Sequence, residues 1–368
     1  MKVLIAMSGG VDSSVAAYLL KQQGYECIGC TMKLFTNGDP VKIPDGQSAD
    51  PACPEADGTK DARAVAERMG IPFYVFDFTD RFRETVMQDF ADNYIAARTP
   101  NPCIVCNRCL KFGALYDRAK ELGCDFIATG HYARIGRENG RYVLKKGSEP
   151  EKDQSYVLYN LTQEQLAHVL FPLGELSKSE VRRLAAEQGL VNAEKPESQD
   201  ICFVPGGDYA GFIHRFCNAE FPEGDVTDTS GRLMGRHRGL IHYTVGQRKG
   251  LGIAAEVPMY VRRLNAEKNT VVLARAEEMF DTALTASGFS WVSGKAPDRP
   301  VRCKARVRYH HPEQDATVTA CPDGTVHVCF DRPVRAITPG QSVVLYDGDS
   351  VLGGGVINSS YERNGAKC

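Results

Sequence analysis

The sequence predicts an α/β protein with an N-terminal doubly wound parallel sheet, a small central domain and a C-terminal β-barrel. Short apolar runs alternate with helical patterns over the first two hundred residues, which is typical of parallel βαβ units. A glycine turn joins the first strand to the first helix. Beyond residue 205, glycines, turns and short alternating runs replace the long helices. We therefore expect domains at residues 1–204, 205–285 and 286–368.

The first strand, the turn and the first helix form the most informative stretch. Residues 2–6 are apolar and branched, as in a strand buried on both faces. A helix that ends near Gly24 follows the glycine turn. The two glycines, Gly9 and Gly10, let the backbone approach a ligand, and the helix presents free N–H groups at its start. This arrangement predicts a phosphate site.

Further strands and helices follow in alternation. We expect strands at 25–34, 71–78 and 125–131, helices at 60–69, 81–98, 110–122, 161–170 and 177–188, and a hairpin turn at Asn139-Gly140. Ligands of such sheets bind beyond the carboxyl ends of strands. Both Ser8-Gly9-Gly10 and Gly130-His131 would lie there.

Composition bounds the function classes. The 368 residues carry a net charge of −2, and no apolar run approaches the length of a membrane span. We therefore expect a cytoplasmic protein with no membrane partner, in which the 13 cysteines indicate thiols, sulfur chemistry or metal before structural disulfides.

Three cysteine groups have different predicted roles. Cys103 and Cys106 follow two prolines that we expect to hold the chain extended, just before a helix N-terminus that lowers a thiol pKa. Cys109 is either a further metal ligand or, by helical spacing, part of the core. Cys27 and Cys30 fit a buried strand better than a chelate. Cys202, between two large apolar residues, resembles core packing when it is considered alone.

Six motifs together carry a resemblance. They are SGGVDSS (8–14), TPNP-x-x-x-CN (99–107), ATGHY (128–132), KDQSY (152–156), SQDICF (198–203) and GQRKGLG (246–252). In this order they resemble the tRNA-specific 2-thiouridylases, a family of PP-loop ATP pyrophosphatases, from residue 2 to about residue 357. No lysine ends the loop, so it is not the common nucleotide-binding P-loop.

The resemblance implies an enzyme that uses ATP to adenylate the C2 oxygen of the wobble uridine in tRNA and then replaces that oxygen with sulfur. Mg²⁺ would offset the phosphate charge. The implied ATP-binding residues are Ala6, Met7, Ser8, Gly9, Gly10, Val11, Asp12, Ser13, Met32 and Gly130.

The resemblance also assigns the sulfur chemistry and the tRNA contacts. Cys202 matches the cysteine that carries a persulfide, and Cys106 matches the partner that frees the sulfur by forming a disulfide with it. A sulfur-donor protein or hydrosulfide would supply the sulfur. The implied tRNA-binding residues are Asn101, Pro102, Cys103, His131, Lys152, Asp153, Gln154, Arg308, Tyr309 and Gln341.

Cys103 departs from the family pattern, because many members have aspartate at this position. The thiols of Cys103, Cys106 and Cys202 could instead ligate three irons of a [4Fe–4S] cluster whose fourth iron binds hydrosulfide. The persulfide route and the cluster route both stay open from the sequence.

Basic residues are expected to form two RNA-contacting surfaces. Arg302, Lys304, Arg306 and Arg308 occur at every second position, which predicts a basic stripe on one face of a strand. The central domain adds Arg232, Arg236, His237, Arg238, His242, Arg248 and Lys249.

Two other function classes compete with tRNA thiolation. A PP-loop amide or guanidine synthetase acting on a small metabolite would share the loop but give no role to Cys106 and Cys202. A non-catalytic RNA-binding module with a structural metal would need no intact loop.

Overall fold

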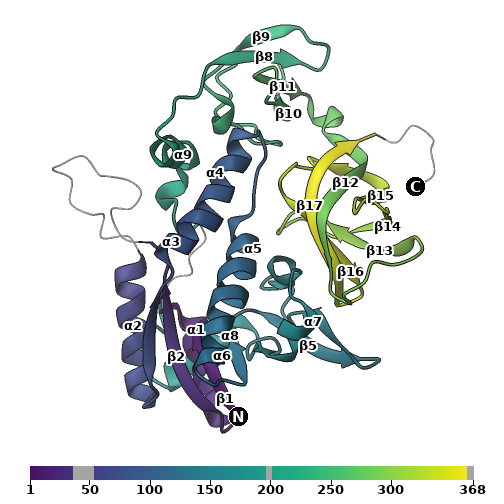
Figure 1. Cartoon of the computed structure of the whole chain (residues 1–368). Helices are drawn as coiled ribbons and strands as arrows, with labels where there is room; N and C mark the ends of the chain where they lie inside the picture. Colours follow the sequence, from purple (N-terminus) through teal and green to yellow (C-terminus); the bar gives the residue numbers. More distant parts are fainter. Residues whose placement is uncertain (36–53, 196–200, 363–368) are drawn as a thin grey trace, which may run out of the picture.

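A five-stranded parallel sheet carries the N-terminal part of the chain. The computed structural model describes residues 1–35, 54–195 and 201–362, and its first sheet has the order β3-β2-β1-β4-β7 (Figure 1). The central β1 is fully buried at Val3, Leu4 and Ile5, as a strand covered on both faces requires. The strands are β1 (Lys2–Ala6), β2 (Glu26–Lys33), β3 (Phe73–Asp77), β4 (Phe126–Ala128) and β7 (Val169–Leu170).

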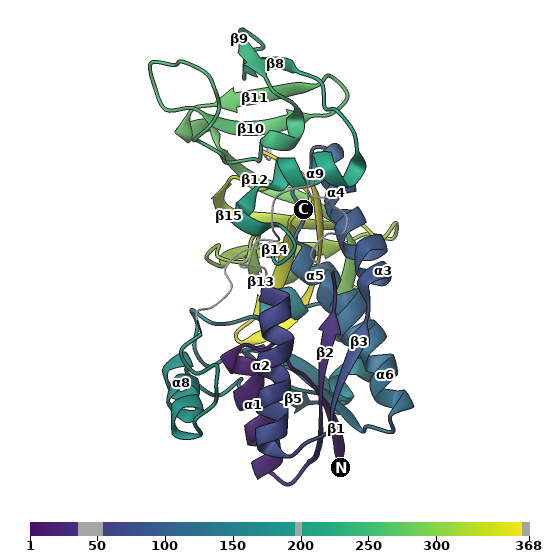
Figure 2. The ribbon, with the colours of Figure 1, turned by 90° about the vertical axis from the view of Figure 1, so that its left-hand side faces the viewer.

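Helices cover both faces of this sheet, which confirms the predicted doubly wound architecture (Figure 2). On the Val3 and Ile5 face lie α1 (Val11–Gln22), α2 (Pro54–Met69) and α8 (Lys178–Glu187). On the Leu4 face lie α3 (Thr79–Phe82), the π-helical η1 (Arg83–Met87), α4 (Gln88–Ile95), α5 (Pro102–Cys106), the π-helical η2 (Asn107–Ala114) and α6 (Leu115–Glu121).

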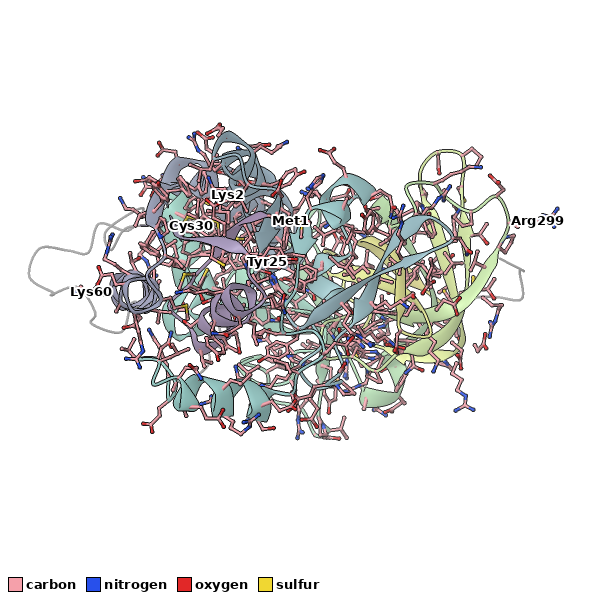
Figure 3. All side chains as sticks on the ribbon, turned by 90° about the horizontal axis from the view of Figure 1, so that it is seen from below. Met1, Lys2, Tyr25, Cys30, Lys60 and Arg299 are labelled. Atoms are coloured by element: carbon pink, nitrogen blue, oxygen red, sulfur yellow. The ribbon has the colours of Figure 1, made fainter. Side chains whose placement is uncertain are left out.

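The two cysteines of β2 point to opposite faces of the sheet. Cys27 packs in the core beneath α1 and α2, whereas Cys30 packs in the core beneath α3 to α6. Both side chains are buried, at 5% and 0% exposure, which confirms that they are core residues. Figure 3 labels Cys30, and it places Lys60 of α2 and Arg299 of the C-terminal domain at opposite ends of the molecule.

Two expected elements differ from the structure. Cys103 does not lie in an extended loop, because Pro102 occupies the first position of α5 and Asn101 caps this helix. Proline is tolerated there, since the first N–H of a helix has no partner to lose. The helix expected at 161–170 is shorter: α7 (Gln163–Ala167) ends early, and Val169 and Leu170 pair with β4 instead.

Local sequence signals explain the neighbouring elements. Asn139 and Gly140 have φ of 49° and 78° and join β5 (Ala133–Glu138) to β6 (Arg141–Lys146), so the hairpin turn is confirmed. Ser177 and Glu180 form the predicted capping box at the start of α8. The 3₁₀ segment η3 (Ser155–Leu158) follows the hairpin.

The central domain is a four-stranded sheet of order β10-β11-β8-β9, drawn at the top of Figure 1. The short η4 (Pro205–Gly207) and α9 (Tyr209–Cys217) lead into it. Its elements are β8 (Gly224–Asp228), β9 (Leu233–His237), η5 (Leu240–His242), β10 (Tyr260–Asn265), β11 (Thr270–Ala274) and η6 (Ala276–Glu278).

The C-terminal strands close into a barrel, because β12 pairs with both β15 and β17. The first of them begins at Phe280, ahead of the expected boundary at 286. The strands are β12 (Phe280–Trp291), β13 (Val301–Arg306), β14 (Gln314–Ala320), β15 (Val326–Arg335), β16 (Ser342–Asp347) and β17 (Ser350–Tyr361).

The hairpin β5–β6 of the N-terminal part joins the barrel sheet, since Lys145 of β6 pairs with Ser350 of β17. Arg134 of β5 reinforces this junction through an ion pair with Asp349, 3.0 Å from nitrogen to oxygen. Within the ranges given above, no helix is both long enough and apolar enough to span a bilayer.

Candidate active site

The turn between β1 and α1, residues Met7 to Gly10, forms a tight loop that we call the phosphate loop. Gly9 has a φ of +74°, and a Cβ at this position would clash with the backbone of Gly58 in α2. Only glycine fits this combination of backbone angle and contact. Gly10 is the N-cap of α1 and makes no side-chain cap, so the first N–H groups of α1 stay available to a ligand.

Hydroxyl groups stabilise the phosphate loop from within. Ser13 Oγ donates to the carbonyl of Gly10 at 3.0 Å and accepts from the backbone N–H of Ser8 at 3.2 Å. Ser14 Oγ donates to the same carbonyl at 3.1 Å. Ser8 is exposed, and its hydroxyl accepts from the Gly10 N–H at 3.4 Å. The loop is therefore held in shape before any ligand arrives.

A lysine from a distant helix completes the loop. Lys178 Nζ lies 2.8 Å from both carboxylate oxygens of Asp12, and the Tyr132 hydroxyl donates to Asp12 Oδ1 at 2.7 Å. Lys178 is buried at 8% exposure. Neither residue was expected at the loop, because they come from α8 and from the segment after β4. The sequence signals at these positions were the ATGHY motif, which ends at Tyr132, and the capping box that starts α8 at Ser177.

Asn192 also contacts the phosphate loop and was not expected there from the sequence. Its side-chain N–H group donates to the carbonyl of Gly9 at 3.0 Å and to Ser14 Oγ at 2.8 Å. Its Oδ1 is buried and has no hydrogen-bond partner among the described residues. Asn192 fixes the far side of the phosphate loop, opposite the exposed Ser8.

The other predicted ATP-binding positions surround the same loop. A Cβ on Gly130 would lie 2.8 Å from the backbone nitrogen of Ser13, so this glycine allows the turn after β4 to pack on α1. Met7 is tied to β2, since its carbonyl accepts from Thr31 Oγ1 at 2.7 Å. Met32, the next residue of β2, is partly buried. The carboxyl ends of β1, β2 and β4 thus meet at one edge, as a doubly wound sheet predicts.

Three cysteine thiols from two segments form a cluster. The charges of Cys103 and Cys106 both act on Cys202, so the three sulfurs lie within electrostatic range of one another. We call Cys103, Cys106 and Cys202 the thiol cluster. Cys103 Nα donates to the side chain of Asn101 at 3.2 Å, which fixes the start of α5.

The expected lowering of the thiol pKa is wrong. Burial raises the pKa of Cys106 to about 11 and that of Cys202 to about 12, and it raises the pKa of Cys103. Cys103 and Cys202 each expose part of their surface, but the crowded protein around the sulfur still disfavours a thiolate. Desolvation therefore outweighs the dipole of α5, which is only five residues long.

Phe203 is anchored in the core, whereas its neighbour Cys202 is exposed to solvent. Phe203 is buried and its ring packs against those of Phe82, Phe90 and Phe212, with centroid distances of 5.5, 5.3 and 5.1 Å. Cys202 is exposed. The expectation of core packing from the apolar neighbours thus describes Phe203 and not the cysteine. Ser198, Gln199 and Asp200 of the same motif lie outside the described residues.

A metal site requires a group of His, Cys, Asp or Glu side chains placed around the ion. Across residues 1–35, 54–195 and 201–362, no three or more His, Cys, Asp or Glu side chains are placed to hold a metal ion. Asp12 is engaged by Lys178 and Tyr132. The described residues as they lie do not fit a [4Fe–4S] cluster.

Comparison with known proteins identifies the family. Residues 1–206 match the family described as tRNA methyl transferase HUP domain. Residues 210–275 match the tRNA methyl transferase PRC-barrel domain, and residues 281–357 match the aminomethyltransferase beta-barrel domain. The tRNA-specific 2-thiouridylase of Acetivibrio thermocellus is 50% identical over 97% of this chain and 99% of its own length. This chain belongs to the tRNA-specific 2-thiouridylase family.

A second relative is also similar over nearly its whole length. The tRNA-specific 2-thiouridylase of Clostridioides difficile is 48% identical over 98% of both chains. Among solved structures, a 4-thiouridine synthetase in complex with RNA and ATP is 19% identical, covers 55% of this chain and 44% of its own, and has a TM-score of 0.36.

Two of the expected tRNA-binding residues, His131 and Asp153, are buried in this structure. His131 is buried at 7% exposure, and its Nδ1 lies 2.7 Å from Thr129 Oγ1. Asp153 is buried at 4% exposure and accepts from the backbone N–H groups of Gly147 and Ser155. Gln154 Oε1 accepts from the Tyr132 N–H at 3.0 Å, and Lys152 is partly exposed. Asp153 and Gln154 thus have structural contacts within the chain, and the tRNA contacts of all four residues stay predictions.

The barrel contacts the segment that precedes the thiol cluster. Gln341 Nε2 donates to the carbonyls of Thr99 and Pro100 at 2.9 and 3.2 Å. The Thr99 N–H donates to the carbonyl of Pro339 at 2.9 Å. Asn101 and the buried Pro102 follow directly. Gln341, which the family resemblance gives as a tRNA contact, here positions the chain next to Cys103.

The predicted basic stripe on β13 is only partly free. Arg302 makes a bidentate pair with Asp331 at 2.7 Å, and Arg306 pairs with both Asp153 and Glu313 at 3.4 and 3.0 Å. The sequence could not show these acids, because they lie on other strands and loops. Lys304 is exposed. Within the predicted basic stripe, Arg302 and Arg306 therefore pair with acids of this chain, and the RNA contact of the stripe stays a prediction.

The remaining basic positions differ in exposure. Arg308 is half-buried, and burial lowers the pKa of its guanidinium. The ring of its neighbour Tyr309 lies 5.9 Å from that of Tyr156. In the central domain, Arg232 and Arg236 pair with acids, His237 is buried and His242 is partly buried. Of the central-domain basic residues expected to contact RNA, Arg238, Arg248 and Lys249 are exposed and form no ion pair with another described residue.

Proposed function

We propose that this chain is an ATP-dependent tRNA-uridine 2-sulfurtransferase, which places sulfur at position 2 of the wobble uridine. One observation carries the proposal: thiols of two distant segments, Cys106 and Cys202, lie within interaction range of each other in a chain that also builds a phosphate loop. Relatives that bear the name tRNA-specific 2-thiouridylase match nearly the whole chain. We place the enzyme in the cytoplasm with its tRNA.

The first step uses the phosphate loop. The C2 oxygen of the uracil attacks the α-phosphorus of ATP, an O–P bond forms, and pyrophosphate leaves. In this proposal, the N–H groups at the start of α1 and the ammonium of Lys178, which lies beside Asp12, hold the leaving phosphates. Asp12, Ser13 and Asn192 keep these groups in position. The oxygen, a poor leaving group, has then become part of AMP.

The second step uses Cys202. A sulfur-donor protein loads Cys202 with a persulfide, whose terminal sulfur attacks C2 of the activated uracil. A C–S bond forms and the C–O bond breaks, so that AMP leaves with the electron pair. In this proposal, Asn101, Pro102 and Cys103 lie next to the target base, which is taken out of its stack to be reached.

The third step uses Cys106. Its thiolate attacks the Sγ of Cys202, which breaks the bond between Cys202 and the transferred sulfur. That sulfur keeps the electron pair and stays on the uridine, while Cys106 and Cys202 become a disulfide. An external dithiol reduces the disulfide before the next turnover. We prefer the persulfide route because no metal-holding group of three or more ligands is found among the described residues; iron and sulfide analysis of anaerobically prepared protein, expected to find neither in stoichiometric amount, checks this preference.

The test replaces Cys202 and measures two quantities. Cys202→Ser should abolish 2-thiouridine formation, assayed by nucleoside mass spectrometry, because serine forms no persulfide. Its affinity for unmodified tRNA should change less than about twofold, since a lost thiol removes no phosphate contact. Cys321→Ser, a partly exposed thiol of the barrel, is the matched control and should keep full activity. Loss of tRNA binding by Cys202→Ser, with thiolation reduced only in proportion, would contradict the assignment.

A second measurement separates the amide synthetase class. Release of pyrophosphate from ATP should be stimulated by unmodified tRNA and not by amino acids or free nucleosides. Stimulation by a small metabolite alone would favour that class instead.

A further inference from the structure

The helix that carries Cys103 and Cys106 changes its winding directly after the second thiol. The α-helical α5 ends at Cys106, and the π-helical η2 begins at Asn107. An α-helix turns by about 100° per residue, so five residues would place a side chain about 140° away around the axis. A π-helix closes its turn at the fifth residue instead. Lys111, five residues after Cys106, therefore lies on the face that carries the thiols.

Packing holds η2 in this winding. A Cβ on Gly113 would lie 2.9 Å from the carbonyl oxygen of Arg108, five residues earlier, so the helix passes tightly over its own backbone. The ring of Phe112 lies 6.0 Å from that of His131. Gln165 donates to the carbonyl of Phe112 at 2.6 Å. The part of η2 next to Lys111 is thus packed against the turn that follows β4.

The ammonium of Lys111 has thiols and an imidazole as neighbours. Its charge acts on Cys103, Cys106, Cys202 and His131. The side chain is partly buried, and no carboxylate of the described residues forms an ion pair with it. A half-buried cation that pairs with no described carboxylate and acts on three thiols would favour a sulfur anion when one of these thiols ionises.

We propose that Lys111 is the counter-ion of the thiol cluster and stabilises the anionic form of its sulfurs. Lys111 is a positioning residue here, because it acts through the cysteines. This role in sulfur transfer rests on the proposed function, whereas the pairing of the ammonium with a thiolate does not.

The electrostatics of the cluster require such a charge. Burial raises the pKa of Cys106 to about 11, so at neutral pH its nucleophilic thiolate is scarce. The neighbouring thiols Cys103, Cys109 and Cys202 oppose a further negative charge, while Lys111 favours it. His131 cannot replace the lysine, because burial and Lys111 itself keep the pKa of the imidazole well below its ordinary value. When one thiol gives its proton to water, the sulfur and the ammonium form a neutral pair.

The test measures thiolate formation directly. Wild-type protein, Lys111→Met and Lys111→Arg are treated with iodoacetamide between pH 6 and pH 10, and alkylation of the exposed Cys103 and Cys202 is quantified by peptide mass spectrometry. Lys111→Met should move the pH profile upward and slow alkylation at pH 8 by about tenfold, which corresponds to one pKa unit. Lys111→Arg keeps the charge and should behave like the wild type. Lys111→Gln gives the same readout should Lys111→Met not fold.

Lys120→Met is the matched control. Lys120 lies on α6, two turns further along, where it is exposed and pairs with Asp117 at 3.3 Å. Its removal should leave the pH profile unchanged. An unchanged profile in Lys111→Met overturns the proposal, and if tRNA affinity falls in the same variant, Lys111 is an RNA-phosphate contact instead.

The outcome is independent of the proposed reaction. Iodoacetamide needs neither ATP nor tRNA, so a shifted profile supports the ion pair even if no thiolation is found. Conversely, active thiolation with an unshifted profile would leave the proposed function intact and remove Lys111 from it.

Discussion

Individual residues divide into those that a motif can indicate and those that only the fold brings near. Ser13 stabilises the loop in which its motif places it, and Cys106 and Cys202 lie within range of each other. Lys178 and Asn192 lack such a signal, because they reach the loop from α8 and from the chain beyond it. The direction of the thiol pKa shifts was also beyond the sequence, since burial depends on the complete structure.

His131 makes stability depend on pH. Burial keeps the pKa of its imidazole well below the ordinary value in the folded protein. Between that value and the unfolded pKa near ~6.5, only the unfolded chain binds the proton, so stability falls as the pH falls, by up to about 1.4 kcal/mol per pH unit. His131→Asn, which retains a polar atom for Thr129, should show a smaller loss of unfolding free energy between pH 7.5 and 5.5. An identical pH slope in both proteins would contradict this prediction.

At the scale of the element, the phosphate loop separates two uses of glycine. A Cβ at Gly9 would meet the backbone of Gly58, and the φ of +74° disfavours any other residue. Gly10 has a φ of −88° and only a 3.4 Å contact with Ser8 Oγ. The two adjacent residues have the same identity in the sequence, and only the structure distinguishes them.

This difference predicts opposite phenotypes for one substitution. Gly9→Ala should destabilise the fold by about 2 kcal/mol or more, the range for a residue forced into a strained backbone region. Gly10→Ala should keep the wild-type melting temperature and weaken binding of a non-hydrolysable ATP analogue, because its Cβ would point at the bound phosphates. Calorimetric unfolding and titration of both variants check the pair. Equal melting temperatures of the two variants would contradict the assignment.

The α5–η2 segment shows two features of secondary structure that were not predicted from the sequence. Proline signals led to an expected extended loop around Cys103, although Pro102 fits the first position of a helix. The winding of η2 leaves no pattern in a single sequence, since it depends on packing against His131 and on the space at Gly113. The helices at 11–22 and 178–187, by contrast, carry clear start or stop signals and were predicted closely.

At the scale of the whole molecule, the order of a parallel sheet and a C-terminal barrel could be predicted from the change in hydrophobic period. The attachment of β5–β6 to the barrel could not be predicted, because its contacts, such as Lys145 with Ser350 and Arg134 with Asp349, join residues far apart in the chain. The partner of Arg306 could not be predicted for the same reason, because it lies far away in the sequence. Alternation placed it on the RNA-facing side of β13, but the buried Asp153 of the N-terminal part binds it.

Arg306→Ala should therefore act on stability more than on RNA affinity. The change leaves Asp153 and Glu313 without their cation, and we expect a loss of about 3 kcal/mol, the lower end for one-sided removal of a buried pair, since Asp153 keeps its other hydrogen bonds. Arg302→Ala, which breaks an exposed pair on the same strand, is the control and should leave the urea midpoint almost unchanged. Equal midpoints for the two variants would contradict the buried network.

Gln341 donates to the backbone carbonyls of Thr99 and Pro100, four and three residues before Cys103. A substrate that tilts the barrel would displace these hydrogen bonds and rotate the first residues of α5. Binding of a large nucleic acid to the barrel would then change the orientation of the Cys103 side chain. Recognition and chemistry would be coupled through this contact.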